Sequence, residues 1–319
     1  MTLALEPTIQ PQLALSRKTL PTGPEWVYEV KLDGFRCLAF VDGEELFLQS
    51  RNGRPLRRYF PELRFPAGSY LLDGEIVVRD EQGREDFDAL GQRIHPADSR
   101  IHLLAVQTPA VYVAFDLLAE GETPLLQRPL SDRRAALEAL LGGEQFTAAP
   151  IELMPTAQTA EQAQRWLTDA EGVIAKQRDA PYLPGERKGM VKVKRVRTID
   201  AVVVGWRPGK LPNTVGALIL GLYDGPELRV VGHCSGLSAA EKKRLVGFLG
   251  QYESGQRGSG DPSRWSAGKE LEWIGLRPEL VVEIDFDHVS AGRIRHGAKL
   301  RRWREDKPPK QCTFEQLST

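Results

Sequence analysis

Cysteine is scarce in this chain of 319 residues, which contains Cys37, Cys234 and Cys312 and no C-x-x-C pair. A disulfide framework and a zinc ribbon are therefore not expected. No apolar run approaches the roughly 20 residues that span a bilayer, and the first residues lack the basic-then-apolar order of a secretory signal. We therefore expect a protein of the reducing cytosol that has no membrane partner.

An excess of either charge is also missing, because 43 Lys and Arg residues balance 43 Asp and Glu residues. This balance excludes a uniformly basic coat, and a hydrophobic content of 41% argues against disorder. The basic residues are nevertheless concentrated. Residues 176–210 hold ten Lys or Arg and three acids, and residues 293–310 hold eight and two. We expect these runs to form a groove for a phosphate backbone, and a solvated face is the alternative.

Short strand-like and helix-like runs alternate in the first part of the chain and predict an α+β fold. Asp42-Gly43 is expected to turn a hairpin. Ser131 is expected to cap a helix through Leu141, and Thr159 a helix through Ala170. Strands are expected at residues 27–30, 38–41, 46–48, 70–72, 76–78 and 111–118.

The pattern changes after Arg197, where short strands are separated by glycine and proline. One helix is expected after the capping box that Ser238 and Glu241 can form. Five or so strands with one intervening helix predict a small Greek-key barrel. The stretch from Arg207 to Thr214 is a candidate DNA-facing loop of that barrel.

Six short motifs and a terminal one follow each other along the chain. They are Lys31-Leu32-Asp33-Gly34, Ser50-Arg51-Asn52-Gly53, Leu72-Asp73-Gly74-Glu75, Phe115-Asp116, Glu171 to Lys176, Val191 to Lys194, and Arg304-Glu305-Asp306-Lys307. Each alone is a weak signal, since a lysine beside an Asp-Gly turn is usually a surface residue. Together they resemble the nucleotidyltransferase motifs of covalent ligases and capping enzymes, and are most similar to those of short two-domain bacterial ATP-dependent DNA ligases of the ligase C type.

The resemblance implies an adenylation (nucleotidyltransferase) domain over residues 1–197, with antiparallel sheets and flanking helices, and an OB-fold β-barrel over residues 198–319. It implies an enzyme of DNA repair that seals 3′-OH/5′-phosphate nicks in duplex DNA through a lysyl-AMP and then an adenylated DNA. ATP would be the AMP donor, and Mg²⁺ or Mn²⁺ the metal. RNA ligation or mRNA capping, and a non-enzymatic nucleic-acid-binding module, are the alternatives.

The nucleophile of such a reaction must be a neutral amine. A free lysine has a pKa near 10.4, so reaching that form at pH 7 costs about 4.6 kcal/mol. Neighbouring cations and a divalent ion lower this cost. Lys31 is the only lysine in a Lys-x-Asp-Gly setting, so we assign it the covalent bond to AMP.

The resemblance implies roles for further residues around the nucleotide. Glu29 would hold adenine and Phe115 would stack on it, although a core role is the alternative for Phe115. Arg36 would hold the ribose or the nick phosphate, with Arg51 close by.

Charged residues of the later motifs would act on the phosphates and the metal. Glu75 and Glu171 would bind the metal or the ribose hydroxyls, and a turn acid is the alternative for Glu75. The lysines that would neutralise the α-phosphate are Lys176, Lys192 and Lys194. Lys192 and Lys194 share one face of a strand, and a solvated edge is their alternative.

Residues near the end of the chain complete the implied site. Arg304, Asp306 and Lys307 would close over the pyrophosphate of ATP during the first step, assisted by Arg302. Nicked duplex DNA is the expected partner, together with a repair polymerase/primase or end-binding proteins. We expect a monomer in the bacterial cytosol and nucleoid.

Overall fold

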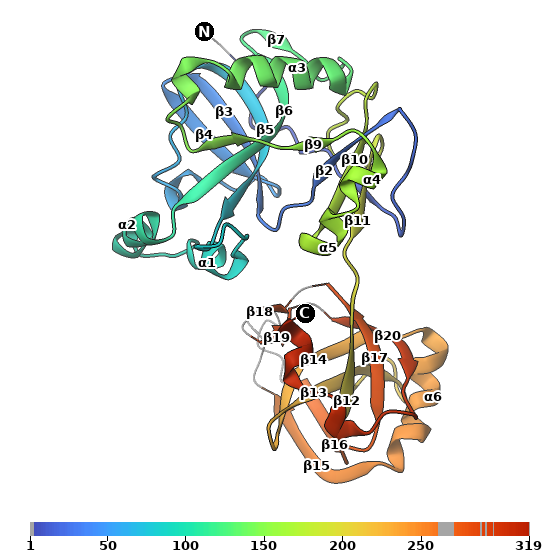
Figure 1. Ribbon diagram of the computed structural model, residues 1–319. Helices are drawn as coiled ribbons and strands as arrows, with labels where there is room; N and C mark the ends of the chain where they lie inside the picture. Colours follow the sequence, from blue (N-terminus) through green and yellow to red (C-terminus); the bar gives the residue numbers. More distant parts are fainter. Residues whose placement is uncertain (1–2, 261–270, 288, 291, 296, 319) are drawn as a thin grey trace. The chain divides into compact units, whose positions relative to one another are not determined.

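The computed structural model describes residues 3–260, 271–287, 289–290, 292–295 and 297–318 (Figure 1). The chain divides into two compact units, Met1–Arg195 and Val196–Thr319, which we call unit 1 and unit 2. The division lies two residues before the predicted boundary at residue 197. No helix among the described residues is both long and apolar enough to cross a membrane.

Two β-sheets form the framework of unit 1 (Figure 1). Among the described residues, one sheet has the order β1-β11-β10-β2-β9, and the other has the order β4-β3-β5-β6-β7 with β8 paired to β6. The strands are β1 (Leu15–Ser16), β2 (Trp26–Val30), β3 (Phe35–Gly43), β4 (Glu45–Ser50), β5 (Gly68–Val78), β6 (Ala110–Glu120), β7 (Thr123–Pro124), β8 (Ile151–Leu153), β9 (Thr156–Ala157), β10 (Gly172–Gln177) and β11 (Met190–Lys194).

The helices of unit 1 depart from the predicted ones in two places. Thr159 caps a helix as expected, since its side chain accepts a hydrogen bond from the Gln162 N–H, but that helix breaks into two short ones. The cap predicted at Ser131 is wrong, because the helix already begins at Leu130 after Pro129. The helices are η1 (Arg57–Tyr59), α1 (Phe87–Gln92), α2 (Asp98–Gln107), α3 (Leu130–Leu141), η2 (Glu144–Phe146), α4 (Ala160–Ala163) and α5 (Trp166–Asp169).

The Asp73-Gly74-Glu75 motif lies inside β5, which runs without interruption between β3 and β6. Glu75 is therefore a strand residue rather than a turn acid. A Cβ atom on Gly74 would lie 2.5 Å from the Tyr112 ring, so glycine lets that ring cross the strand. Tyr112 then donates a hydrogen bond to the Cys37 carbonyl at 2.9 Å, which ties β6 to β3 across β5.

Unit 2 is a β-barrel, and the order of its strands shows which barrel fold it has. Its described residues form a sheet in the order β13-β14-β20-β17-β12-β16-β15, and β12 also pairs with β13. The strands β12, β13, β14, β20 and β17 thus close into a ring, with β14 and β20 parallel and the remaining pairs of the ring antiparallel. Five closed strands in Greek-key order are the OB fold.

One α-helix, α6 (Ala239–Gly250), lies between the third and fourth strands of this ring, and the expected capping box of Ser238 and Glu241 opens it. The β15–β16 hairpin, which extends the sheet beyond β12, was not predicted. The elements are β12 (Arg197–Pro208), β13 (Val215–Asp224), β14 (Glu227–Gly236), β15 (Glu253–Gly260), β16 (Leu271–Leu276), β17 (Val281–Phe286), β18 (Val289–Ser290), β19 (Arg293–Ile294), β20 (Ala298–Trp303), η3 (Pro309–Gln311) and η4 (Phe314–Ser318).

Candidate active site

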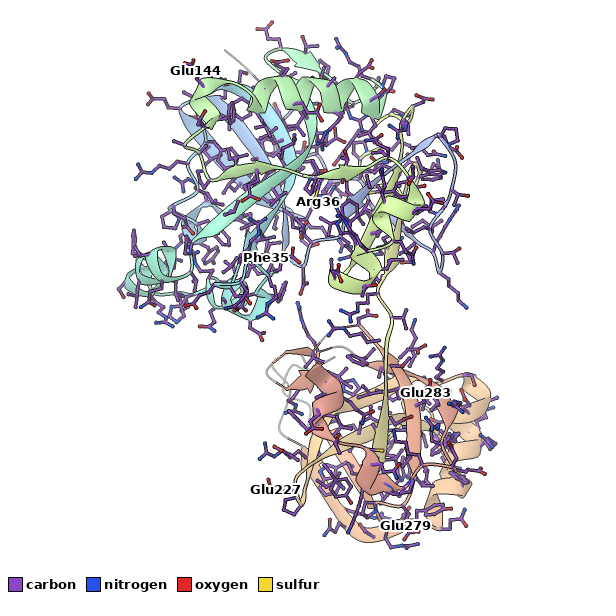
Figure 2. All side chains as sticks on the ribbon, viewed as in Figure 1. Phe35, Arg36, Glu144, Glu227, Glu279 and Glu283 are labelled. Atoms are coloured by element: carbon purple, nitrogen blue, oxygen red, sulfur yellow. The ribbon has the colours of Figure 1, made fainter. Side chains whose placement is uncertain are left out.

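A pocket in unit 1 collects most of the residues predicted for that domain. It holds about 910 Å³ of empty space, including the part open to solvent. Its walls come from strands of both sheets, among them β3 with the half-buried Arg36, which is labelled in Figure 2. The predicted residues that line it are Glu29, Lys31, Arg36, Arg51, Glu75, Phe115, Lys176 and Lys192.

Lys31 lies directly after β2 and faces the start of β10. Its backbone N–H donates to the Gly172 carbonyl at 2.9 Å, and its Nζ atom contacts a carboxylate oxygen of Glu171. The other oxygen of Glu171 lies 3.4 Å from Lys194 Nζ. The structure therefore gathers the predicted nucleophile, one predicted metal ligand and one predicted phosphate-binding lysine around a single carboxylate.

The motifs of Lys31 and Glu171 each contain a glycine that the close approach of neighbouring atoms requires. Gly172 has a φ of +153°, and a Cβ atom there would lie 2.2 Å from the Val193 carbonyl oxygen. A Cβ atom on Gly34 would lie 2.5 Å from the Ile76 carbonyl oxygen and 2.6 Å from Glu75 Cγ. Both positions therefore need glycine. Gly34 lets the Lys31 loop approach Glu75, and Gly172 brings Glu171 beside β11.

Glu75 lies in a pocket wall that disfavours its charge. Burial raises the pKa of Glu75 to about 7, and the positive charges of Arg36 and Lys31 only partly oppose this rise. Burial has already removed much of the hydration of this carboxylate, so a bound cation would stabilise its negative charge. Glu75 and Glu171 together supply hard oxygen donors, which suit a Mg²⁺ ion shared with nucleotide phosphates.

A Mg²⁺ ion that also binds nucleotide phosphates needs only one or two carboxylates from the protein. Glu75 and Glu171 can supply them, so the residues fit the predicted metal. The described residues contain no group of three or more His, Cys, Asp or Glu side chains placed to hold a metal by themselves. The nucleotide would therefore have to complete the coordination. Glu171 would have to release Lys31 to take part.

Phe115 lies in the pocket wall, and two cations lie close to its ring. Arg36 Cζ is 4.4 Å and Lys176 Nζ is 4.5 Å from the centre of its ring. Phe115 is buried but still lines the pocket, so its ring is placed where a base can reach it. Cations near an aromatic face are held by the ring quadrupole.

Glu29 and Lys176 form a buried ion pair at this end of the pocket. The Nζ atom of Lys176 lies 2.9 and 2.7 Å from the two oxygens of Glu29. Burial raises the pKa of Glu29, and Lys176 opposes that rise. The structure thus brings Lys176 to the predicted adenine end, with Glu29, rather than beside Lys31. Its predicted action on the α-phosphate stays a prediction.

Arg36 is held in place by residues that the sequence did not single out together. Its guanidinium forms two hydrogen bonds of 2.6 Å to Asp73, and the Tyr182 hydroxyl donates to the same carboxylate at 2.6 Å. The Gln12 N–H donates to the Tyr182 oxygen at 2.9 Å. Residues Pro11 to Ala14, which precede every strand expected from the sequence, also line the pocket and so form part of its wall.

Lys192 lies in a strongly positive environment. Burial lowers the pKa of Lys192, and the positive charges of Lys31, Lys194 and Arg51 lower it further. Lys192 and Lys194 are partly exposed on β11, whereas the valines before them are buried, so the two lysines share a face. Arg51 is exposed and lies at the wall of the same pocket.

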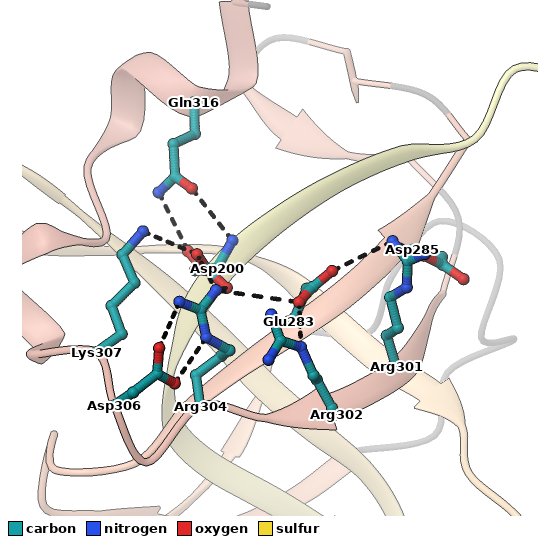
Figure 3. Close-up of polar contacts among 9 residues, drawn as sticks. All are labelled: Asp200, Glu283, Asp285, Arg301, Arg302, Arg304, Asp306, Lys307 and Gln316. Atoms are coloured by element: carbon teal, nitrogen blue, oxygen red, sulfur yellow. Dashed lines mark hydrogen bonds and ion pairs between the residues drawn. The ribbon is translucent and has the colours of Figure 1, made fainter.

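The predicted residues near the end of the chain belong to unit 2 and form an ion-pair network with acids of other strands (Figure 3). Arg304 and Lys307 both contact Asp200 of β12, and Arg304 also contacts Asp306. Arg302 contacts Glu283 of β17 at 2.6 Å. The second basic run is therefore partly neutralised by acids that lie far away in the sequence.

A lysine paired with a carboxylate, in a pocket with an aromatic ring and a buried acid, is the arrangement expected of a covalent nucleotidyltransferase. An OB barrel follows it in the same chain.

The comparisons with known proteins agree. Residues 11–194 match the family described as ATP dependent DNA ligase domain, and residues 212–307 match ATP dependent DNA ligase C terminal region. DNA ligase C1 of Mycolicibacterium smegmatis is 42% identical over 100% of this chain and 96% of its own length. DNA ligase C of Mycobacterium tuberculosis is 41% identical over 99% and 96%. The solved structure of mycobacterial DNA ligase D complexed with ATP and MES is 29% identical, covers 96% of this chain and 98% of its own, and has a TM-score of 0.53.

The chain therefore belongs to the ATP-dependent DNA ligase family. The family and the fold class predicted from the motif order are confirmed. The role of each site residue stays a prediction.

Proposed function

We propose that this enzyme seals nicks in duplex DNA during repair, with Lys31 as the residue that becomes adenylated. The observation that carries the proposal is the placement of Lys31 beside Glu171, in a pocket whose other residues include Glu29 and Phe115. One pocket thus offers an amine nucleophile, acids and an aromatic ring for a base. The matching ligase family and the ATP-bound relative support ATP as the AMP donor.

In the first step, Lys31 must separate from Glu171 and lose a proton to solvent before its nitrogen can attack. The lone pair of Nζ attacks the α-phosphorus of ATP, a P–N bond forms, and the bond from that phosphorus to the bridging oxygen breaks. Pyrophosphate leaves with the electron pair. Holding the amine beside the phosphorus replaces a bimolecular encounter by a local one, which lowers the barrier.

The chain orients the nucleotide by its base and sugar. Glu29, fixed by Lys176, accepts a hydrogen bond from the exocyclic amino group of adenine, and Phe115 stacks on the base. Arg36, fixed by Asp73, binds the ribose or the nick phosphate. Lys192 and Lys194 stabilise the negative charge on the α-phosphate as it becomes five-coordinate.

We propose that Glu75 and Glu171 hold Mg²⁺ or Mn²⁺ together with the phosphates of ATP. The ion supplies charge neutralisation at the phosphates when bound. We also propose that Arg304, Asp306 and Lys307, assisted by Arg302, act on the pyrophosphate in this step alone.

Two further transfers complete the sealing reaction. A 5′-phosphate oxygen at the nick attacks the phosphorus of lysyl-AMP, so that the P–N bond breaks and adenylated DNA forms. The 3′-hydroxyl then attacks the 5′-phosphorus, the phosphodiester forms, and AMP leaves. Any sequence is accepted if the protein binds backbone and duplex shape rather than base edges.

We propose that one copy of the chain is sufficient, since it carries every motif of the reaction, and that it works in the bacterial cytosol and nucleoid. The basic runs of both units support contact with DNA. So does the segment from Arg207 to Thr214, whose first two residues end β12 and whose remainder is the loop before β13. A repair polymerase/primase or an end-binding protein is the proposed recruiting partner.

Labelled nucleotide tests the proposal. With magnesium and α-labelled ATP, the wild-type chain should gain covalent label, and Lys31→Ala should gain none. Lys243→Ala, an exposed lysine of α6, is the control and should label like wild type. Label from GTP alone would favour a capping enzyme, and sealing of nicked RNA alone an RNA ligase. Label retained on Lys31→Ala would refute the assignment, and no label on any variant would favour a binding module.

A further inference from the structure

One carboxylate in unit 2 holds both cations of the terminal Arg304–Lys307 motif. Asp200 lies near the start of β12 and is 8% exposed. Arg304 Nη1 is 2.8 and 2.9 Å from its two oxygens, and Lys307 Nζ is 2.8 Å from Oδ2 (Figure 3). Because both nitrogens contact the same oxygen, they cannot lie farther apart than the sum of two hydrogen-bond lengths.

The orientation of Arg304 is determined on two sides. Its Nε and Nη2 atoms donate to the two oxygens of Asp306 at 2.9 and 2.8 Å, while Nη1 donates to Asp200. Glu283 lies 3.9 Å from Nη1. A planar guanidinium held by two carboxylates in this way has little freedom to rotate.

Asp200 itself is held by the last helical turn of the chain. Its backbone N–H donates to Gln316 Oε1, and Gln316 Nε2 donates to its carbonyl oxygen, both at 3.1 Å. The carboxylate therefore projects from a backbone fixed by a strand and by a side-chain amide of η4. Lysine and arginine side chains lose substantial rotamer entropy when they bind an anion, and a fixed partner removes part of that cost in advance.

We propose that Asp200 is a positioning residue for the first step, holding Arg304 and Lys307 together so that they can receive the pyrophosphate portion of ATP. The proposal rests on the proposed function of these two residues. Two cations held close together match the adjacent phosphate groups of a polyphosphate, and neighbouring phosphates are where negative charge accumulates as the leaving group departs. Asp200 does not touch the reacting atoms, and it acts through the two cations.

A positioning role differs from a purely structural one in which step it affects. If Asp200 only stabilised the barrel, its loss would weaken every step and lower the melting temperature. If it positions Arg304 and Lys307, its loss slows the formation of lysyl-AMP and leaves the sealing of a nick that already carries AMP nearly unchanged. The two steps can be measured separately on the full chain.

The test uses Asp200→Asn, which keeps the side-chain shape and the backbone contacts with Gln316. We expect single-turnover formation of lysyl-AMP to fall by about 10- to 100-fold. Sealing of a pre-adenylated nick should stay within about threefold of wild type. Asp285→Asn is the matched control, because Asp285 lies on β17 of the same sheet and is 3.8 Å from Arg301, outside the terminal motif. It should change neither step.

Two outcomes overturn the proposal: lysyl-AMP formation at the wild-type rate, or equal loss of both steps at a wild-type melting temperature. If Asp200→Asn does not fold, Gln316→Ala decides, because it keeps the carboxylate but frees its backbone. It should slow the first step selectively, and an unchanged first step would overturn the proposal. Lys307→Ala tests the underlying function separately. If Lys307→Ala forms lysyl-AMP at the wild-type rate, the role proposed for the terminal motif in the first step is wrong, independently of the result for Asp200→Asn.

Discussion

Lys192 shows at the scale of one residue how the pocket tunes a charge. Burial, together with the positive charges of Lys31, Lys194 and Arg51, lowers its pKa. In the folded chain it therefore loses its proton at a lower pH than an ordinary lysine. The charged form is disfavoured by folding, so this residue costs stability at neutral pH, and the cost is relieved as the pH rises. If Lys192 acts on the α-phosphate as proposed, the positive charge that it supplies there should be lost over the same pH range.

Lys192→Arg should therefore move the alkaline fall of lysyl-AMP formation to higher pH, because arginine stays charged throughout. We expect the rate at neutral pH to fall by less than about tenfold, since the charge is kept but the geometry changes. Single-turnover labelling from about pH 7 to about pH 10 gives the profile. If the rate of lysyl-AMP formation falls at the same alkaline pH in wild type and Lys192→Arg, a group other than Lys192 causes that fall.

Individual site residues could be predicted from the sequence where they belong to a motif of a few consecutive residues. The glycines of the Lys31 and Glu171 motifs are there because a Cβ atom would strike neighbouring backbone, and such constraints leave a signature in the sequence. The supports of the site were not predictable in the same way. Tyr182 reaches Asp73 across 109 residues, and Arg304 reaches Asp200 across 104. No local pattern encodes contacts of that range.

At the scale of elements, a buried ion pair joins α3 to β6. Arg133 forms hydrogen bonds of 2.8 and 2.9 Å with Asp116, and both side chains are at most 3% exposed. The Arg133 guanidinium also donates to the carbonyl oxygens of Arg128 and Ala180. The pair thus connects a helix, a strand beside the pocket and the loop that follows β10.

Asp116→Ala should lower the free energy of unfolding by about 3–5 kcal/mol, because it leaves a buried guanidinium without its carboxylate. The double variant Asp116→Leu with Arg133→Met should recover most of that loss, since it removes both charges. Denaturant unfolding of the full chain measures the two values. A loss below about 1 kcal/mol in the single variant would mean that water or another acid reaches Arg133.

The start of a helix could be predicted from the sequence where the side chain of the preceding residue caps the helix. Ser238 with Glu241, and Thr159, cap helices because their oxygens accept backbone N–H groups. Ser131 has the same chemistry but lies inside α3, because Pro129 takes the N-cap position two residues earlier and the helix begins at Leu130. The helices α1 and α2 and the strands β15 and β16 were not predicted, although α2 buries Ile101 and Leu104, which are spaced as on one face of a helix.

For the whole molecule, the pairing of distant strands decides the architecture. The barrel closes through the parallel pair β14 and β20, and the first residues of the chain join the pocket because β1 pairs in parallel with β11. Parallel pairing between distant segments leaves little trace in a local pattern. The barrel was predicted from the number of short strands and one helix, whereas the place of residues 11–14 in the pocket wall was not predicted.

Charge is also a property of the whole molecule, and the structure alters what the sequence counts implied. The second basic run is interleaved in space with acids. Glu283 lies 3.2 Å from Arg301 and 2.6 Å from Arg302. Cations already paired with carboxylates release fewer counterions when they meet phosphates. We therefore expect nick binding to depend on salt less steeply than the number of basic residues in the two runs implies.

Glu283→Gln should free the charge of Arg301, which lies 3.2 Å from Glu283, and strengthen nick binding. It should also steepen the dependence of log Kd on log salt by about 0.9 for each phosphate gained. Glu227→Gln is the matched control, because it removes the same charge from the exposed end of β14, where Glu227 pairs with Arg229. Binding of a nicked duplex at several salt concentrations measures both slopes. If the two variants change Kd and slope equally, only net charge matters, and the phosphate groove does not include this face of unit 2. If Glu283→Gln alone steepens the slope, Arg301 contacts DNA, and its pairing with Glu283 limits how tightly the enzyme holds a nick.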